Sequence, residues 1–426
     1  MRERQRRSGI IMVQTLVVIA GLLALMATLA ANQRAMLNRT QTQLRTRRAE
    51  VAARSAVALA LATLQEADPN VVTLNDEWAI LGENGSQVFE LDGASYRLQI
   101  VDCGSRINVN TATEFQLQTL PITPEQRDSL LDWREAAIQG RPEGAKDEFY
   151  NGLAQPYNAR LGRLSTLSEL LLIRGWTAIG LYSPVTEVVS TTGTLPEDAA
   201  GNPLALIDLL TVESGMPNTR PDGAARVNIS QGNVDAGALA QLGIAPNLAE
   251  TIAEGAPYSS FEQLLSLPGV STQAAQQLLD DVTVTPSNRL EGKVNINTAP
   301  QAVLESIGNL PPDIAAAILS RQATGFLSLG ELATIPGVTG LALAQIADSV
   351  GIGSDTWLVR AYGESGGVGV AVEVTIGIRD GEVQIVNFDR LPDPGVPEWW
   401  NWETDATTAA ASAAEAGPTA DAGAAQ

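Results

Sequence analysis

The first 31 residues constrain this chain more than any other segment. A leader with four arginines, residues 1–9, precedes a predominantly apolar run from Ile10 to Ala31 that contains no charged residue. A run of about 20 apolar residues is long enough to cross a bilayer as a helix. All four arginines lie on one side of the run, and basic residues favour the cytoplasmic side of a membrane. The rest of the chain is therefore expected outside the inner membrane.

The apolar run continues into a segment that also favours a helix. Neither glycine nor proline occurs from Asn32 to Ala67, and the segment is rich in Ala, Leu, Gln, Arg and Glu, which are strong helix formers. Asp68-Pro69 ends the pattern, because proline cannot continue a helix. We expect one helix over residues 10–67, with residues 10–31 in the membrane. A cleaved secretory signal, whose apolar region is about 7–15 residues, and a twin-arginine export signal are the alternatives.

Charge is sharply divided along the chain. Residues 1–54 hold ten arginines and two glutamates, a net of +8, which leaves 17 basic and 46 acidic residues, a net of −29, in the remainder. So acidic a body repels phosphate backbones, and we expect no nucleic-acid partner. The chain has no histidine, which removes Ser-His-Asp and Cys-His catalysis, and we expect no enzyme. Cys103 is the single cysteine and is expected to be a buried thiol.

Three related strings mark internal repeats. R-I-N-V-N-T-A-T begins at Arg106, A-R-V-N-I-S-Q-G at Ala225 and K-V-N-I-N-T-A-P at Lys293. Short apolar-periodic segments follow each string. In the last copy, Asn297 or Thr298 is expected to cap the helix that follows, because short polar side chains accept hydrogen bonds from the first amides of a helix.

The segments after each string are typical of helix-hairpin-helix units, in which two short helices meet across a glycine turn. We predict units over residues 104–200, 201–286 and 287–354. The predicted turn glycines are Gly175, Gly269 and Gly337.

Helix-hairpin-helix units have two common roles. They can bind a phosphate backbone through amides at a helix N-terminus, aided by Lys and Arg. The second and third turns lack such cations: residues 264–284 and 332–353 contain no Lys or Arg, but contain Asp280, Asp281 and Asp348. Charge therefore favours a structural or protein-binding role over DNA binding.

Strand-like segments lie on both sides of the repeats, at residues 71–103 and 355–390. Asp92-Gly93, Gly366-Gly367 and Asp380-Gly381 are strong hairpin turns between apolar-alternating runs. A lone hairpin is marginal in water, so we predict that both sets form one antiparallel sheet packed on the long helix. The predicted class is α+β, with a large all-α helix-hairpin-helix insertion between two strands of the sheet.

The leader, the single apolar helix and the folded body resemble a type IV pilin-like protein. The resemblance implies that a prepilin peptidase cleaves between Gly9 and Ile10. It also implies a glutamate at the fifth residue of the mature chain, paired with the N-terminal amine of a neighbouring subunit. That residue here is Gln14, which carries no charge. The resemblance then points to a tip subunit; the alternative is that Gln14 is a polar residue tolerated in the membrane.

The repeats inserted into the sheet narrow the resemblance to the minor pseudopilin K family of the type II secretion system. Its most specific string is V-N-I-N-T-A-P at residues 294–300. Further segments that resemble the family are Asp132-Trp133-Arg134, Glu148-Phe149-Tyr150, residues 155–158 and Ser168-Glu169-Leu170. The resemblance runs from about Arg6 to Leu391. It is weakest over residues 225–285, which we interpret as an additional helical copy.

The resemblance implies a protein that caps a short pseudopilus and starts its assembly with two other minor pseudopilins, I and J. The major pseudopilin and the prepilin peptidase would be further partners. The body would lie in the periplasm on a single-pass inner-membrane anchor. Helix-to-helix contacts would drive assembly, through Gln14 in the membrane and a face that carries Val51, Leu59 and Leu64 outside it.

Some members of this family bind calcium. Glu143, Asp147 and Glu148 offer the oxygen ligands that calcium prefers. A solvated acidic loop is the other interpretation of these residues. We therefore assign no metal site, and expect no cofactor other than this calcium candidate.

Residues 391–426 form a separate C-terminal segment. Trp399, Trp400 and Trp402 precede an acidic, alanine-rich end whose composition is typical of disorder. We expect the tryptophans to fold back onto the sheet; binding a partner is the alternative. For the whole chain, the alternatives are a membrane-tethered helix-hairpin-helix DNA receptor and a minor pilin of a type IV or competence pilus.

Overall fold

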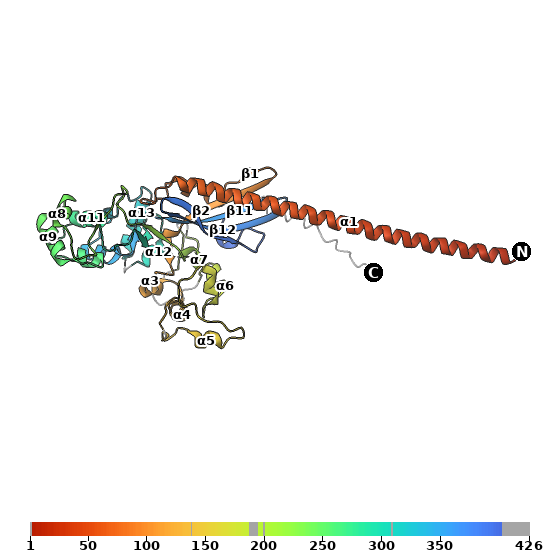
Figure 1. Cartoon of the computed structure of the whole chain (residues 1–426), viewed down its shortest axis with the longest axis horizontal. Helices are drawn as coiled ribbons and strands as arrows, with labels where there is room; N and C mark the ends of the chain where they lie inside the picture. Colours follow the sequence, from red (N-terminus) through yellow and green to blue (C-terminus); the bar gives the residue numbers. More distant parts are fainter. Residues whose placement is uncertain (1, 138, 187–194, 199–200, 308–309, 403–426) are drawn as a thin grey trace, which may run out of the picture.

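A single long helix projects from a folded body (Figure 1). The computed structural model describes residues 2–137, 139–186, 195–198, 201–307 and 310–402, with side chains from Met12 onward. Helix α1 (Arg2–Gln65) has 64 residues and is about 96 Å long at 1.5 Å per residue. It begins inside the expected leader and ends two residues before the expected end at 67. By length and composition α1 could cross a membrane.

The body is built on a five-stranded antiparallel sheet in the order β1-β2-β11-β12-β13. Strands β1 (Phe89–Leu91) and β2 (Ala94–Asp102) precede the repeats, whereas β11 (Thr356–Ser365), β12 (Val368–Arg379) and β13 (Glu382–Arg390) follow them. Strand β2 pairs with β11, from Trp357 opposite Asp102 to Glu364 opposite Ser95. The two strand sets therefore form one sheet with the repeats inserted between its central strands, which confirms the predicted α+β class.

The hairpins form where the turn dipeptides predicted them. Asp92-Gly93 has φ of 41° and 75°, Gly366-Gly367 has 55° and 78°, and Asp380-Gly381 has 54° and 81°. Two successive positive φ values are typical of type I′ turns, whose twist matches that of the flanking strands.

The second half of α1 packs on one face of the sheet. Its contact stripe is made of small residues: Ala49, Ala53, Ala56 and Ala60 are fully buried. They let the helix lie close to β11, where Gly363 completes the fit. A Cβ at Gly363 would overlap the backbone of Ala49 and Ala53, so only glycine allows this approach.

Each repeat is closed by a pair of short parallel strands. Unit 1 (residues 107–211) joins β3 (Ile107–Asn108) to β4 (Leu210–Thr211), unit 2 (residues 227–283) joins β6 (Val227–Asn228) to β7 (Val282–Thr283), and unit 3 (residues 294–351) joins β9 (Val294–Asn295) to β10 (Val350–Gly351). Unit 1 thus closes at Thr211, and its expected boundary at residue 200 was too early because its long insertion delays the closing strand.

The helices of the units are short. Unit 1 contains α3 (Glu114–Thr119), α4 (Pro124–Arg134), α5 (Asp147–Asn151), η3 (Leu167–Leu172), α6 (Ala178–Tyr182) and α7 (Leu206–Leu209). Unit 2 contains α8 (Ala236–Gln241), α9 (Pro246–Gly255), α10 (Phe261–Leu265) and α11 (Thr272–Asp281). Unit 3 contains α12 (Gln301–Glu305), α13 (Pro312–Gln322), η4 (Leu329–Thr334) and α14 (Gly340–Ala347).

Smaller elements connect these parts. They are α2 (Glu77–Ile80), η1 (Glu83–Gly85), η2 (Cys103–Ser105), η5 (Glu398–Trp400) and the antiparallel pair β5 (Gly215–Pro217) and β8 (Arg289–Glu291).

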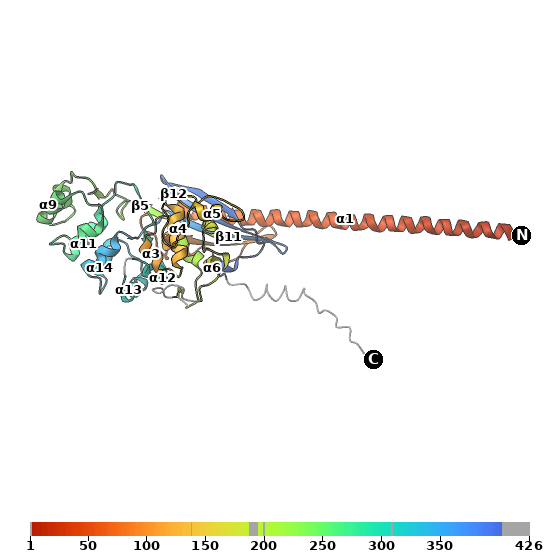
Figure 2. The same ribbon diagram turned by 90° about the horizontal axis from the view of Figure 1, so that it is seen from below.

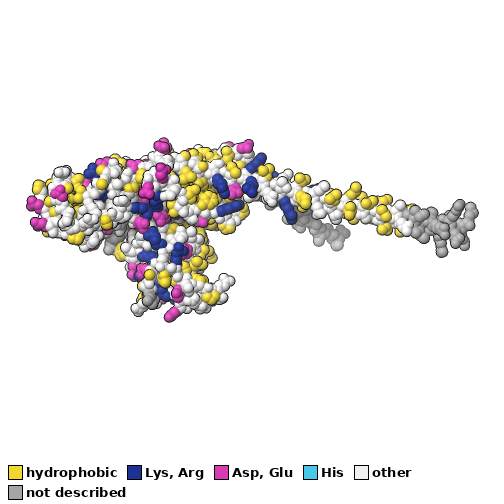
Figure 3. All heavy atoms as spheres, viewed as in Figure 1, with side chains coloured by type: hydrophobic (Ala, Val, Ile, Leu, Met, Phe, Trp, Pro, Cys, Tyr) yellow, Lys and Arg dark blue, Asp and Glu magenta, His cyan; other side chains and the backbone are white. Residues whose placement is uncertain are grey.

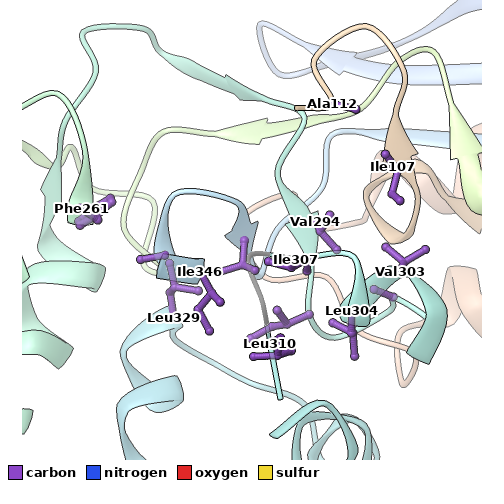
Figure 4. Close-up of a cluster of buried hydrophobic side chains, with 14 of the residues drawn as sticks. Ile107, Ala112, Phe261, Val294, Val303, Leu304, Ile307, Leu310, Leu329 and Ile346 are labelled. Atoms are coloured by element: carbon purple, nitrogen blue, oxygen red, sulfur yellow. The ribbon is translucent and has the colours of Figure 1, made fainter. Parts of the chain in front are cut away.

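One continuous apolar core runs through all three units, and a second core lies between α1 and the sheet. Figure 4 shows part of the first core, in which Ile107 from unit 1 and Phe261 from unit 2 join Val294 and Ile346 from unit 3. Shared burial of this kind couples the units into one body, because removing any of them would expose apolar surface of the others.

The C-terminal strap (residues 391–402) folds back across the sheet, as expected for its tryptophans. Trp400 and Trp402 pack on Ala371 of β12. The Trp400 indole donates to Glu373 Oε1 at 2.8 Å, and the Trp402 indole donates to Gln99 Oε1 at 3.1 Å. The tail expected to be disordered, residues 404–426, lies outside the described residues.

Candidate assembly site

The membrane-side part of α1 carries the residues expected to direct processing and assembly. Gly9 and Ile10 lie in helical backbone, and their side chains are outside the described residues. Gln14 is exposed in a stretch whose large apolar side chains, from Met12 to Leu29, are all exposed as well. This apolar surface needs a covering of lipid or other helices.

The expected soluble contact face of α1 is corrected by the structure. Leu64 is fully buried in the core between α1 and the sheet, and Leu59 packs against the same core. Val51 is 57 % exposed. Thirteen residues separate Val51 from Leu64, which places them about 140° apart on a helix that turns 100° per residue. Val51 and Leu64 therefore do not share a face: Val51 is available to a partner, Leu59 is partly exposed and Leu64 is not accessible.

A buried carboxylate joins the sheet to unit 3. Asp102, at the end of β2, is 2 % exposed. It accepts hydrogen bonds from the Gly104 amide at 2.7 Å, from Asn295 Nδ2 at 2.9 Å and from Thr298 Oγ1 at 2.6 Å. Burial raises the pKa of Asp102 above its ordinary value, although these donors oppose the shift. The V-N-I-N-T string, through Asn295 and Thr298, is thus the segment that holds unit 3 on the sheet.

The neighbouring Cys103 is inert for a related reason. Its side chain is 2 % exposed, and burial raises the pKa of its thiol to about 12. A thiol reacts as its thiolate, so this cysteine is a core residue rather than a reactive site.

The repeated asparagines have the same two roles in units 1 and 3. Asn108 and Asn295 each accept a hydrogen bond from the amide two residues on, at 3.0 Å in both units. The second asparagine bridges to the other half of its unit: Asn110 exchanges two hydrogen bonds with the backbone of Leu164, and Asn297 does so with Phe326. Asn297 therefore clamps two hairpins together.

The expected helix-capping role of Asn297 or Thr298 is wrong. The residue that precedes α12 as its N-cap is Pro300, with no side-chain cap. Both polar side chains are drawn instead to more distant buried groups, Asn297 to Phe326 and Thr298 to Asp102, because leaving those groups unpaired would cost more than leaving an exposed helix end to water.

In unit 1, the two asparagines act together with Arg134 of the Asp132-Trp133-Arg134 segment. Its two Nη atoms donate to the carbonyls of Val109 and Ala112, both at 2.7 Å. In unit 3, Gln322 Nε2 donates to the equivalent carbonyls of Ile296 and Ala299, both at 2.8 Å. An arginine and a glutamine thus perform one task, which only a comparison of the two units reveals.

Unit 2 departs from this scheme. Asn228 keeps the first role and accepts from the Ser230 amide at 2.8 Å, but Ser230 replaces the second asparagine. Its shorter side chain bonds back to Asn228, and the link to the second hairpin is a backbone bond from Tyr258 to Ile229. Unit 2 is therefore the divergent copy.

Units 2 and 3 hold one another through reciprocal contacts. Helix α11 packs on η4, and α14 packs on α10. Asp280, at the end of α11, accepts from the Gly330 amide in η4 at 2.8 Å. Asp348, which follows α14, accepts from the Phe261 and Glu262 amides of α10 at 3.0 and 3.2 Å. Each unit thus supplies a carboxylate to a helix N-terminus of the other, where negative charge is favoured.

The three turn glycines have the left-handed backbone expected of them. Gly175, Gly269 and Gly337 have φ of 82°, 87° and 89°. Acidic side chains lie beside two of the turns: Glu125 next to Gly175, and Asp313 next to Gly337. Carboxylates at these places disfavour a phosphate ligand, and the lack of a nucleic-acid partner stays a prediction.

The acidic loop of unit 1 is arranged around Asp132. This carboxylate is fully buried, and Arg141 lies 3.3 Å and Lys146 3.9 Å from it. Of the calcium candidates, Asp147 accepts from the Ala159 amide at 2.7 Å, whereas Glu143 and Glu148 are exposed. Within the part of the chain that the structure describes, no three acidic, cysteine or histidine side chains form a metal-binding group. Calcium binding here stays untested.

These features define a class of protein: a pilin-like chain with a single apolar anchor helix, a small sheet on that helix, and a helix-hairpin-helix insertion. Two segments, residues 107–189 and 294–353, match family models that are described as type II secretion system, protein K. They fall on units 1 and 3 and include both clamp motifs. The chain is therefore a protein K-like minor pseudopilin of the type II secretion system, a component of a secretion apparatus. Unit 2 lies outside both matches.

Two further comparisons complete this result. No curated protein matches the sequence. Among solved structures, the crystal structure of the GspK-GspI-GspJ complex from the enterotoxigenic Escherichia coli type 2 secretion system is similar, at 14% identity and a TM-score of 0.49, and the match covers 85% of this chain and 100% of that chain.

Proposed function

We propose that this minor pseudopilin caps the tip of a periplasmic pseudopilus and starts its assembly together with I-type and J-type minor pseudopilins. Gln14 is the observation that carries the proposal. A carboxylate in the hydrocarbon region is costly unless it is paired, and ordinary pilin-like subunits pair theirs with the amine of a neighbour. An amide at this position offers no such charge, so the subunit has no need of a neighbour above it.

The shape of the molecule supports the tip position. Units 2 and 3 lie at the end of the body opposite the N-terminus of α1 (Figure 2). With α1 anchored in the membrane, they would point away from it into the periplasm. A subunit stacked on that end would meet units 2 and 3 instead of the apolar helices that filament subunits share.

Processing is part of the proposal. We infer that a prepilin peptidase removes residues 1–9, which leaves Ile10 as the N-terminus of a single-pass inner-membrane protein with its body in the periplasm. The major pseudopilin would then add below the tip complex.

Intact mass spectrometry of the membrane-extracted chain tests the proposal, with and without co-expressed prepilin peptidase. We expect the peptidase to remove residues 1–9, and we expect the processed chain to co-purify with I-type and J-type minor pseudopilins. A chain that stays full length, or is cut near Ala30, would refute a pilin-like role.

Substitution of Gln14 tests the tip position separately. If the missing charge keeps this subunit at the tip, Gln14→Glu should allow copies to enter the filament body, which antibodies against unit 2 would detect along the filament by electron microscopy. Gln33→Glu, on the same helix beyond the apolar run, is the matched control. Wild-type chains found along the filament would exclude a tip-only location.

A further inference from the structure

The part of α1 between the apolar run and the centre of the sheet is rich in exposed arginines. Residues 34–54 contain six exposed arginines, at positions 34, 39, 45, 47, 48 and 54. No Asp or Glu occurs between Ile10 and Ala49. Among the described residues, Arg54 pairs with Glu50 at 3.0 Å, and the other five arginines form no ion pair. Figure 3 shows basic side chains gathered where the helix joins the body, which is otherwise rich in acidic groups.

Exposed aliphatic side chains lie between these arginines at a regular spacing. Leu37, Leu44 and Val51 are 62 %, 54 % and 57 % exposed and follow one another at seven-residue intervals, so they share one face of the helix. This face is about 160° from Ala53, which is fully buried against the sheet. The stripe therefore points away from the body, and Arg47 and Arg48 flank it on both sides.

The structure also places most of the arginines beyond the reach of lipid. The apolar run ends at Ala31, and at 1.5 Å per residue Arg39 lies about 12 Å and Arg48 about 25 Å beyond it. The polar layer of a bilayer is only about 5–8 Å deep on each side. Lipid headgroups can reach Arg34, but the charges that flank Leu44 and Val51 lie beyond the headgroup layer, where carboxylates of a neighbouring protein can pair with them.

We propose that this outward face of α1, residues 34–54, docks a helix of another minor pseudopilin that carries aliphatic residues at seven-residue spacing with carboxylates beside them. The proposal rests on the proposed function and names the surface and the chemistry of its partner. Seven-residue spacing suits a helix that lies alongside α1. Carboxylates of that helix opposite the arginines would determine which helix binds and how it is aligned along α1.

Charge reversal tests the electrostatic part. The full chain would be purified in detergent with the I-type and J-type minor pseudopilins of its own secretion system, and the affinity measured from about 50 to 500 mM NaCl. We expect affinity to fall with salt, and Arg47→Glu to weaken the complex about fivefold. Arg390→Glu, an equal reversal at an exposed position of β13, should have no effect. Reversing a carboxylate of the partner helix to Arg should restore the affinity of Arg47→Glu.

A second pair of variants tests the apolar stripe. Leu44→Asp should abolish the complex, whereas Ile179→Asp, at a position that is 78 % exposed on α6, should leave it intact. Both positions are exposed, so circular dichroism and gel filtration should show a folded chain in each case.

The outcomes separate this inference from the proposed function. A complex that forms but ignores salt, Arg47→Glu and Leu44→Asp would overturn the docking surface and leave the tip role standing. Failure of the wild-type chain to bind any minor pseudopilin would overturn both. If Arg47→Glu instead weakens only the binding of phosphatidylglycerol vesicles, the arginines serve lipid and the docking proposal is wrong.

Discussion

Removal of the Asn295 side chain gives a sharp test of how unit 3 is held on the sheet. Asn295 is fully buried. It donates to the Val72 carbonyl at 3.1 Å and to Asp102 at 2.9 Å, and it accepts from the Asn297 amide at 3.0 Å. Asn295→Ala leaves all three groups short of a partner in a dry site. A buried hydrogen bond contributes about 1 kcal/mol, and one to a charged group about 1.5–3, so we expect a loss of about 4 kcal/mol.

The repeat supplies its own control. Asn228 occupies the equivalent position in unit 2, where it accepts only from the amide and hydroxyl of Ser230 and is partly exposed. Asn228→Ala should cost about 1–2 kcal/mol. The same substitution in two copies of one motif thus differs by about 2–3 kcal/mol, because only Asn295 reaches the sheet.

Urea unfolding of the full chain in detergent, followed by tryptophan fluorescence, measures both losses. Hydrogen exchange locates them: Asn295→Ala should speed the exchange of amides in β9 and β10, and Asn228→Ala that of amides in β6 and β7. Equal losses in the two variants, or a loss below about 1 kcal/mol for Asn295→Ala, would refute the role of Asp102 as the link between sheet and unit 3.

Three further predictions follow from the packing. With a thiol pKa of about 12, Cys103 should resist iodoacetamide at pH 8 in the folded chain and react fully in urea. Gly363→Ala should destabilise the body by more than about 2 kcal/mol, because the methyl group meets the α1 backbone, whereas Gly340→Ala, where no atom lies near, should not destabilise it. Burial raises the pKa of Asp280, so the folded chain holds that proton more tightly than the unfolded chain. Lowering the pH from about 7 to about 4 should therefore stabilise the wild type relative to Asp280→Asn, and a pH-independent difference between their unfolding free energies would contradict this.

The sheet was predictable because its signals are local. Dipeptides such as Asp92-Gly93 fix a turn type with their own backbone preferences, and alternating apolar residues fix which face is buried. The pairing of the strands before and after the insertion was predictable because neither strand set is stable alone. The sequence could also have shown that Leu64 and Val51 lie on different faces of the helix, because helical periodicity alone separates them.

The roles of the buried polar residues were not predictable in the same way. Asn297 fits a helix cap by local rules, and nothing near it in sequence reveals Phe326 as its partner. Asp280 and Asp348 were interpreted as charges that repel phosphate, whereas each bonds to helix amides in the other unit. Such contacts depend on which elements meet in space, and this cannot be inferred from the local sequence.

The reciprocal contacts also bear on what distinguishes this chain. Unit 2 lies outside both family matches and has Ser230 in place of the second asparagine. It is nevertheless bound to unit 3 by the Asp280 and Asp348 hydrogen bonds and by a shared core. Without unit 2, η4 and α14 would expose apolar side chains and Asp348 would lose the amides it accepts from. The surface of unit 3 is thus fitted to unit 2, so unit 2, at the end of the body far from the N-terminus of α1, is the part of this molecule that differs most from what the family motifs describe.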